Sequence, residues 1–175
     1  MASTAKEIYI SGLSSAHALE QQAIQILERQ AERLENYPEL AARIREHVDE
    51  SREQQARLGR ILESLGSSHS SMKDMGMGLM GNLAAMAHVA AQDEVLKDTF
   101  ANFAFENYEI ASYRSLITFA EAAGDLQSVP VLQRSLQEEE AMAEWIDEHL
   151  DQVIRTYLQR ESGQQRETGG QKPGV

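Results

Sequence analysis

Residues 106–113 read ENYEIASY and combine apolar side chains with two glutamates three residues apart. Between residues 88 and 123, the side chains of one predicted helix face recur at steps of three and four residues. This spacing predicts one long helix, which ends at Gly124. Glu106 and Glu109 share a face of this helix with apolar side chains. Because a carboxylate on a buried face needs a partner, we expect the helix to carry both part of the core and part of a polar site.

Three further segments have helical periodicity, at about residues 4–35, 38–65 and 128–158. Pro38 is suited to the first turn of a helix, and Gly66 ends the second segment. Residues 72–86 hold five of the seven methionines, with three glycines, and form a long connection between the second and third helices. Four amphipathic helices joined in this way predict an all-α, ferritin-like four-helix bundle with a long crossover between helices two and three.

The domain boundaries follow from the same periodicity. Residues 1–158 are predicted to form the bundle, and the Gly-, Gln- and Arg-rich residues 159–175 a disordered tail. A low aromatic content of 6% and only three prolines agree with a helical protein rather than a strand-rich one.

Composition excludes several functional classes. With 16 basic and 28 acidic side chains the net charge is −12, which disfavours nucleic acid and anionic membranes as partners. The chain has no cysteine, so a metal would need carboxylate or imidazole ligands. Neither a signal peptide nor a membrane-spanning run is recognisable, and we expect a cytoplasmic protein.

Three of the four apolar stripes contain glutamates near their centres, namely Glu20, Glu106 with Glu109, and Glu139. If these side chains meet at one level of the bundle, each must be protonated, paired with a base or bound to a cation. A dinuclear metal site would satisfy all of them. The alternative is that each glutamate lies at the edge of its stripe, with its carboxylate in water or paired to a nearby arginine.

The stretch ENYEIASY closely resembles the third-helix signature of the YciE/YciF family of bacterial stress proteins, which are ferritin-like bundles. The segments ALEQQ (18–22), HVDES (47–51) and LQEEE (136–140) resemble other parts of that family. The resemblance implies a ferritin-like fold that is usually a homodimer, with inward carboxylates placed where related di-iron proteins hold metal: Glu20, Glu50, Glu106, Glu109 and Glu139. We expect these carboxylates to be the metal ligands, with His47 either a further ligand or a donor behind one.

The sequence also departs from the di-iron pattern. Such bundles contribute Glu-x-x-His from each of two helices, and this motif is absent from the chain. The second helix offers His47-x-x-Glu50 instead, and Arg52 on its flank could neutralise a carboxylate. A carboxylate-only site, a single-metal site and a metal-free relic held by Arg52 and protons all remain open.

The function expected from these features is a stress-response protein that handles oxygen or peroxide at two iron or manganese ions. If it is an enzyme, it is a di-metal oxidoreductase, with no catalytic residue assigned. The alternative is a metal-free helical scaffold that binds a protein partner through its acidic surface or its methionine-rich crossover.

Overall fold

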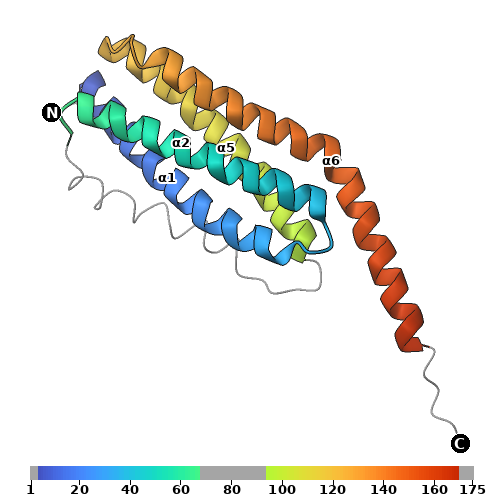
Figure 1. Ribbon diagram of the computed structural model, residues 1–175. Coiled ribbons are helices and arrows are strands. Elements are labelled where there is room, and N and C mark those ends of the chain that lie inside the picture. The colour runs from blue at the N-terminus through green and yellow to red at the C-terminus, as the bar shows by residue number, and fades with distance from the viewer. Residues whose placement is uncertain (1–3, 68–93, 170–175) are drawn as a thin grey trace, which may run out of the picture.

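The computed structural model describes residues 4–67 and 94–169, and side chains of the last helix as far as residue 163. These residues form four helices, and the two described ranges contain no strand: α1 (Ala5–Arg33), α2 (Pro38–Ser64), α5 (Glu94–Ala123) and α6 (Val129–Gly169). The helices lie alongside one another as a bundle (Figure 1). The prediction of an all-α four-helix bundle is therefore confirmed. The predicted methionine-rich crossover, residues 72–86, lies outside the described residues.

The helix ends follow from local sequence. At the start of α1, Thr4 accepts a hydrogen bond from the Glu7 amide, and the Glu7 carboxylate accepts one from the Thr4 amide. Pro38 occupies the first turn of α2, where its missing N–H is tolerated. Gly66 and Gly124 follow α2 and α5 with φ of 75° and 79°, a left-handed conformation that favours glycine.

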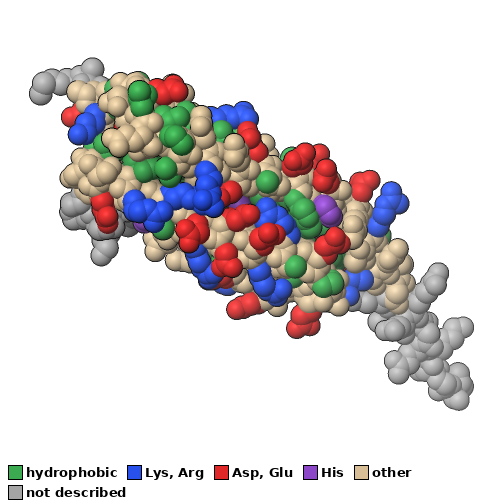
Figure 2. All heavy atoms as spheres, turned by 45° about the horizontal axis from the view of Figure 1, so that its top comes forward, with side chains coloured by type: hydrophobic (Ala, Val, Ile, Leu, Met, Phe, Trp, Pro, Cys, Tyr) green, Lys and Arg blue, Asp and Glu red, His purple; other side chains and the backbone are tan. Residues whose placement is uncertain are grey.

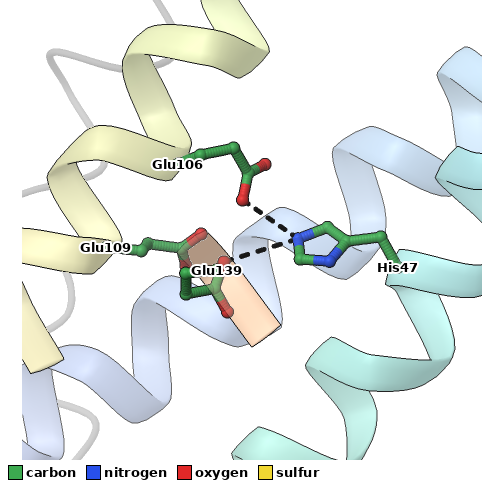
Figure 3. A group of neighbouring side chains, drawn as sticks. All are labelled: His47, Glu106, Glu109 and Glu139. Atoms are coloured by element: carbon green, nitrogen blue, oxygen red, sulfur yellow. Dashed lines mark ion pairs between the residues drawn. The ribbon is translucent and has the colours of Figure 1, made fainter. Parts of the chain in front are cut away.

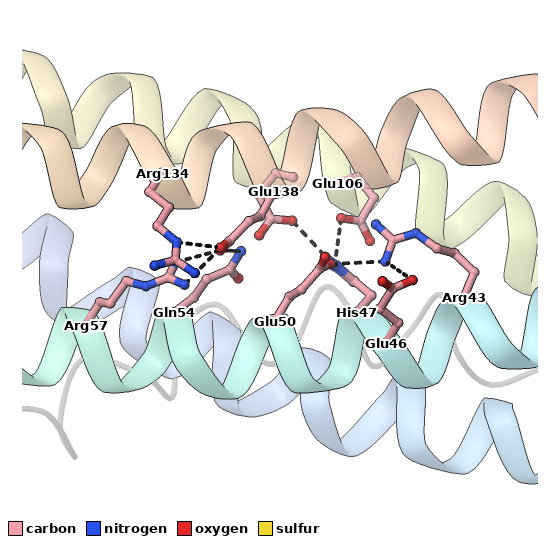
Figure 4. A network of polar contacts seen from close by, with 10 residues as sticks. Arg43, Glu46, His47, Glu50, Gln54, Arg57, Glu106, Arg134 and Glu138 are labelled. Carbon is pink, nitrogen blue, oxygen red and sulfur yellow. Dashed lines mark hydrogen bonds and ion pairs between the residues drawn. The ribbon is translucent and has the colours of Figure 1, made fainter.

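The helices are not joined equally closely. Helix α1 packs against α2 and α5, and α5 packs against α6, whereas α2 and α6 approach one another at fewer positions. Part of the junction between α2 and α6 is polar (Figure 4). There the Arg57 guanidinium donates to both carboxylate oxygens of Glu138, at 2.5 and 2.9 Å, and to Ser135 Oγ at 3.0 Å.

The core consists of two apolar clusters. One cluster includes Leu27, Ile44 and Ile146, and the other includes Leu13 and Leu116. Along α1, α5 and α6, glutamates lie in the sequence between the positions that contribute to the two clusters: Glu20, Glu106, Glu109 and Glu139. The bundle therefore places a polar layer between two apolar halves of its core.

Helix α6 continues to Gly169, past residue 158 where the apolar periodicity ends, and projects beyond the other helices (Figure 1). The periodicity ends because it records packing rather than helicity, and Leu158 is already 58% exposed. Gln, Arg and Glu, which are frequent over 159–167, are good helix formers without a packed face. The end of the predicted tail, residues 170–175, lies outside the described residues.

Charged side chains of both signs are interspersed on the face shown in Figure 2. Within the described part of the chain, no helix combines the length and apolarity needed to cross a membrane.

The buried ion pair between α2 and α6 gives a first testable prediction. We expect Arg57→Met to lower the free energy of unfolding by about 3–5 kcal/mol, because Glu138 would remain largely buried without that cation. Urea denaturation of the metal-free protein measures this change.

Arg134 provides a matched control, because its Nε donates to the same carboxylate at 3.1 Å from a side chain that is 70% exposed. Arg134→Met should change the free energy of unfolding by less than about 1 kcal/mol. Equal losses in the two variants would show that burial of Arg57 does not matter.

Candidate metal centre

Four ionisable side chains from three helices converge in the polar layer. His47 of α2 faces Glu106 and Glu109 of α5 and Glu139 of α6 (Figure 3). One potential ligand atom from each lies within 4.8 Å of the others. His47 Nε2 is 3.1 Å from Glu106 Oε2 and 3.5 Å from Glu139 Oε2, and all four side chains are at most 1% exposed. The geometry is compact enough for ligands of one metal ion.

Most of the facing atoms lack hydrogen-bond partners among the described residues. These atoms are His47 Nε2, Glu20 Oε2, Glu106 Oε2, and both carboxylate oxygens of Glu109 and Glu139. Buried polar atoms are rarely left unpaired in folded proteins, so a group of them calls for an ion, protons or water. Carboxylate oxygens and a neutral imidazole nitrogen are suitable ligands for iron and manganese. The donor set therefore fits a metal.

Burial and mutual repulsion raise the pKa of Glu20, Glu109 and Glu139. Burial raises the pKa of Glu20 to about 8, with a further contribution from Glu106. Burial, followed by neighbouring carboxylates, raises the pKa of Glu109 and Glu139 well above the usual range. The layer without metal is thus partly neutralised by protons.

His47 also contributes positive charge. Burial opposes its charged form, but Glu106, Glu50 and Glu139 outweigh this effect and raise the pKa of His47 well above its ordinary value. Without metal, these pKa shifts favour the protonated forms of Glu20, Glu109 and Glu139 and the charged form of His47.

Glu20 adjoins the four converging side chains. Its Oε1 accepts a hydrogen bond from the Tyr113 hydroxyl at 2.5 Å, while its Oε2 has no hydrogen-bond partner in the part of the chain that the structure describes. Tyr113 is itself part of an apolar cluster, and burial together with the charge of Glu20 raises its pKa well above the usual range. The hydrogen bond from Tyr113 therefore holds Glu20 in place and leaves its Oε2 available for a further contact.

Glu50 is located differently from the other predicted ligands. Its side chain is 27% exposed, and its Oε2 lies 2.8 Å from His47 Nδ1 and 3.1 Å from Arg43 Nη1 (Figure 4). Burial tends to raise the pKa of Glu50, but His47 and Arg43 lower it below the usual value. Of the six predicted ligands, four converge, Glu20 adjoins them, and Glu50 lies behind His47.

Arg52 does not have the role predicted from the sequence. Its side chain is about half exposed and pairs with Asp49 and Glu28. The arginines beside the polar layer are instead Arg43 and Arg57, which bind Glu50 and Glu138. Sequence reasoning missed both, although Arg43, Glu50 and Arg57 follow one another at steps of seven residues, which return to the same helix face.

Two other polar side chains of α2 lie near His47 in the sequence but were not among the predicted ligands. Ser51 and Gln54 are fully buried, and Ser51 Oγ and Gln54 Oε1 have no hydrogen-bond partner among the described residues. The Gln54 amide nitrogen donates to Glu138 Oε2 at 3.1 Å. Their positions four and seven residues after His47 were the available signal, because both steps return to the same helix face.

Comparisons with known proteins agree on one family. The family described as a domain of unknown function, DUF892, matches residues 4–159. Protein YciF of Escherichia coli K12 is 29% identical over 149 residues, which cover 79% of this chain and 85% of YciF. These matches span nearly the whole described bundle.

Solved structures give the same result. A protein of Xanthomonas campestris pv. campestris superposes with a TM-score of 0.76 at 34% identity, covering 91% of this chain and 99% of that chain. The E. coli stress protein YciF superposes with a TM-score of 0.68 at 24% identity, covering 89% and 98%. The resemblance seen in the sequence is therefore confirmed, and the chain belongs to the DUF892 family of YciF-like proteins.

Proposed function

We propose that this protein binds two divalent ions, iron or manganese, in its polar layer and uses them to handle oxygen or peroxide during stress. The observation that carries the proposal is the charge of the layer. Four buried carboxylates, those of Glu20, Glu106, Glu109 and Glu139, would carry four negative charges when ionised. Two divalent cations would balance that charge.

The available ligand atoms support two positions. His47, Glu106, Glu109 and Glu139 would hold the first ion, since their ligand atoms already lie close together. Glu20 would hold the second with the remaining oxygens of Glu109 and Glu139, which have no hydrogen-bond partner among the residues described. Glu109 and Glu139 would then contribute to both positions, since each carboxylate has two acceptor oxygens.

The protein environment supports a protected redox site. When bound, two such ions would supply the electrons for a two-electron reduction of peroxide or for reaction with dioxygen. The apolar clusters on both sides keep bulk water away, and the hydrogen bond from Tyr113 holds Glu20 in place. An activity of this kind would make the protein a di-metal oxidoreductase, in keeping with the description of the E. coli relative as a stress protein.

One observation favours the alternative, a metal-free scaffold that acts through a protein partner. The raised pKa values of Glu20, Glu109 and Glu139, together with that of His47, allow the layer to approach neutrality without metal. Metal content separates the two functions directly.

We expect the protein purified without chelator, then loaded with Fe(II) under anaerobic conditions, to retain about two equivalents of metal by plasma mass spectrometry. Glu139→Ala should lose most of this metal, because Glu139 is fully buried and contributes to both proposed positions. Glu140→Ala is the matched control, since Glu140 is 42% exposed and pairs with Arg114 outside the layer.

The result that contradicts the proposal is equally clear. If neither the wild-type protein nor Glu140→Ala retains metal, the layer is structural and the scaffold alternative gains support. If metal is retained, peroxide and oxygen consumption should be measured on the same samples, with Glu139→Ala as the inactive reference.

A further prediction concerns pH. The pKa of Glu20 is about 8 in the folded protein against an ordinary value of 4.5, so folding favours its protonated form. That stabilisation is fully present below about pH 4.5 and is lost as the pH rises through about 8. The raised pKa of His47 acts in the same direction. The melting temperature of the metal-free protein should therefore fall between about pH 5 and pH 8.

Differential scanning calorimetry across this range provides the measurement. Glu20→Gln should reduce the slope, because the amide does not titrate. Added Mn(II) should raise the melting temperature most at the alkaline end, where protons compete least for the ligands. A melting temperature that is independent of pH in the metal-free protein would contradict the assigned protonation of the layer.

A further inference from the structure

We propose that Glu50 is a positioning residue that fixes the tautomer and ring direction of His47, rather than a ligand of the metal. This inference rests on the proposed metal site and assigns a role within it. Glu50 Oε2 lies 2.8 Å from His47 Nδ1, while His47 Nε2 faces Glu106 on the other side of the ring (Figure 4). The imidazole thus separates Glu50 from the converging ligand atoms.

The contact dictates which ring nitrogen carries the hydrogen. A carboxylate accepts hydrogen bonds, so Nδ1 must donate to Glu50. When His47 is neutral, its lone pair is then on Nε2, the atom that faces Glu106 and Glu139. A metal-binding histidine needs this arrangement, with a lone pair toward the ion and the opposite N–H held by an acceptor.

Arg43 holds Glu50 in this position. Its Nη1 donates to the same oxygen, Glu50 Oε2, at 3.1 Å, and its side chain is only 11% exposed. Arg43, His47 and Glu50 follow one another on α2 at steps of four and three residues, which brings them onto one helix face. To become a ligand, Glu50 would have to leave both of these partners.

The test uses Zn(II), a diamagnetic ion that accepts histidine and carboxylate ligands. Isothermal titration should show that Glu50→Ala binds Zn(II) about 10–100-fold more weakly than wild type, with the number of ions bound unchanged. Glu50→Gln should recover part of the affinity, because its amide oxygen still accepts from Nδ1. Asp49→Ala is the matched control on the same helix, since Asp49 is 77% exposed and pairs with Arg52.

Nitrogen-15 NMR of the zinc-loaded protein reads the tautomer independently of affinity. His47 should be protonated on Nδ1 and metal-bound through Nε2 in the wild type, and this signature should be weakened or mixed in Glu50→Ala.

Two results would overturn the positioning role alone. An affinity in Glu50→Ala equal to that of wild type would show that Glu50 does not act on His47. Loss of a bound ion in this variant would show that Glu50 is a ligand, as first predicted from the sequence. Absence of Zn(II) binding by the wild-type protein is a different result, because it would overturn the proposed metal site and with it this role.

Discussion

The burial of four glutamates beside one imidazole is the constraint on which the rest of this structure depends. Removing a carboxylate from water is unfavourable unless it is protonated, paired or bound to a cation. Here the carboxylates of Glu106, Glu109 and Glu139 approach one another and lie next to Glu20, so repulsion adds to desolvation. Apolar packing on both sides of the layer must offset this, which explains why the core is divided into two clusters.

Helix α2 supplies most of the cationic side chains at the edge of the polar layer. Its His47 faces inward, Arg43 holds Glu50 behind the imidazole, and Arg57 binds Glu138 of α6. Glu50 and Glu138, at the edge of the layer, both have a lowered pKa, although burial alone would raise it. His47 and Arg43 outweigh the effect of burial at Glu50, and Arg57 outweighs it at Glu138. Within the layer, the pKa values of Glu20, Glu109 and Glu139 are shifted in the opposite direction. The direction of each pKa shift therefore depends on whether a permanently cationic side chain lies beside that glutamate.

The sequence predicted the fold well because helical periodicity directly reports which faces are buried. The sequence also identified Glu106, Glu109 and Glu139 as candidate site residues, because a charged residue at the centre of an apolar stripe is unusual. The suggestion that Arg52 neutralises a carboxylate of the site was wrong, because spacing identifies a helix face but not the direction of a long side chain. Glu50 shares a face with His47, and only three-dimensional packing shows that one lies behind the other. Helix α6 beyond residue 158 left no signal because an unpacked helix has no apolar stripe.

The placement of arginines bears on why the layer exists. Arg43 and Arg57 show that α2 supplies guanidinium groups within a few turns of the layer. Yet in the part of the chain that the structure describes, none lies within ion-pairing distance of Glu106, Glu109 or Glu139. A layer that needed only neutrality could have been balanced by such a permanent cation. Burial and neighbouring carboxylates instead raise the pKa of Glu109 and Glu139, and the imidazole of His47 lies beside Glu106 and Glu139. Under the proposed function, a divalent ion would take the place of protons on these side chains, so that the charge compensation of the dry core would remain exchangeable.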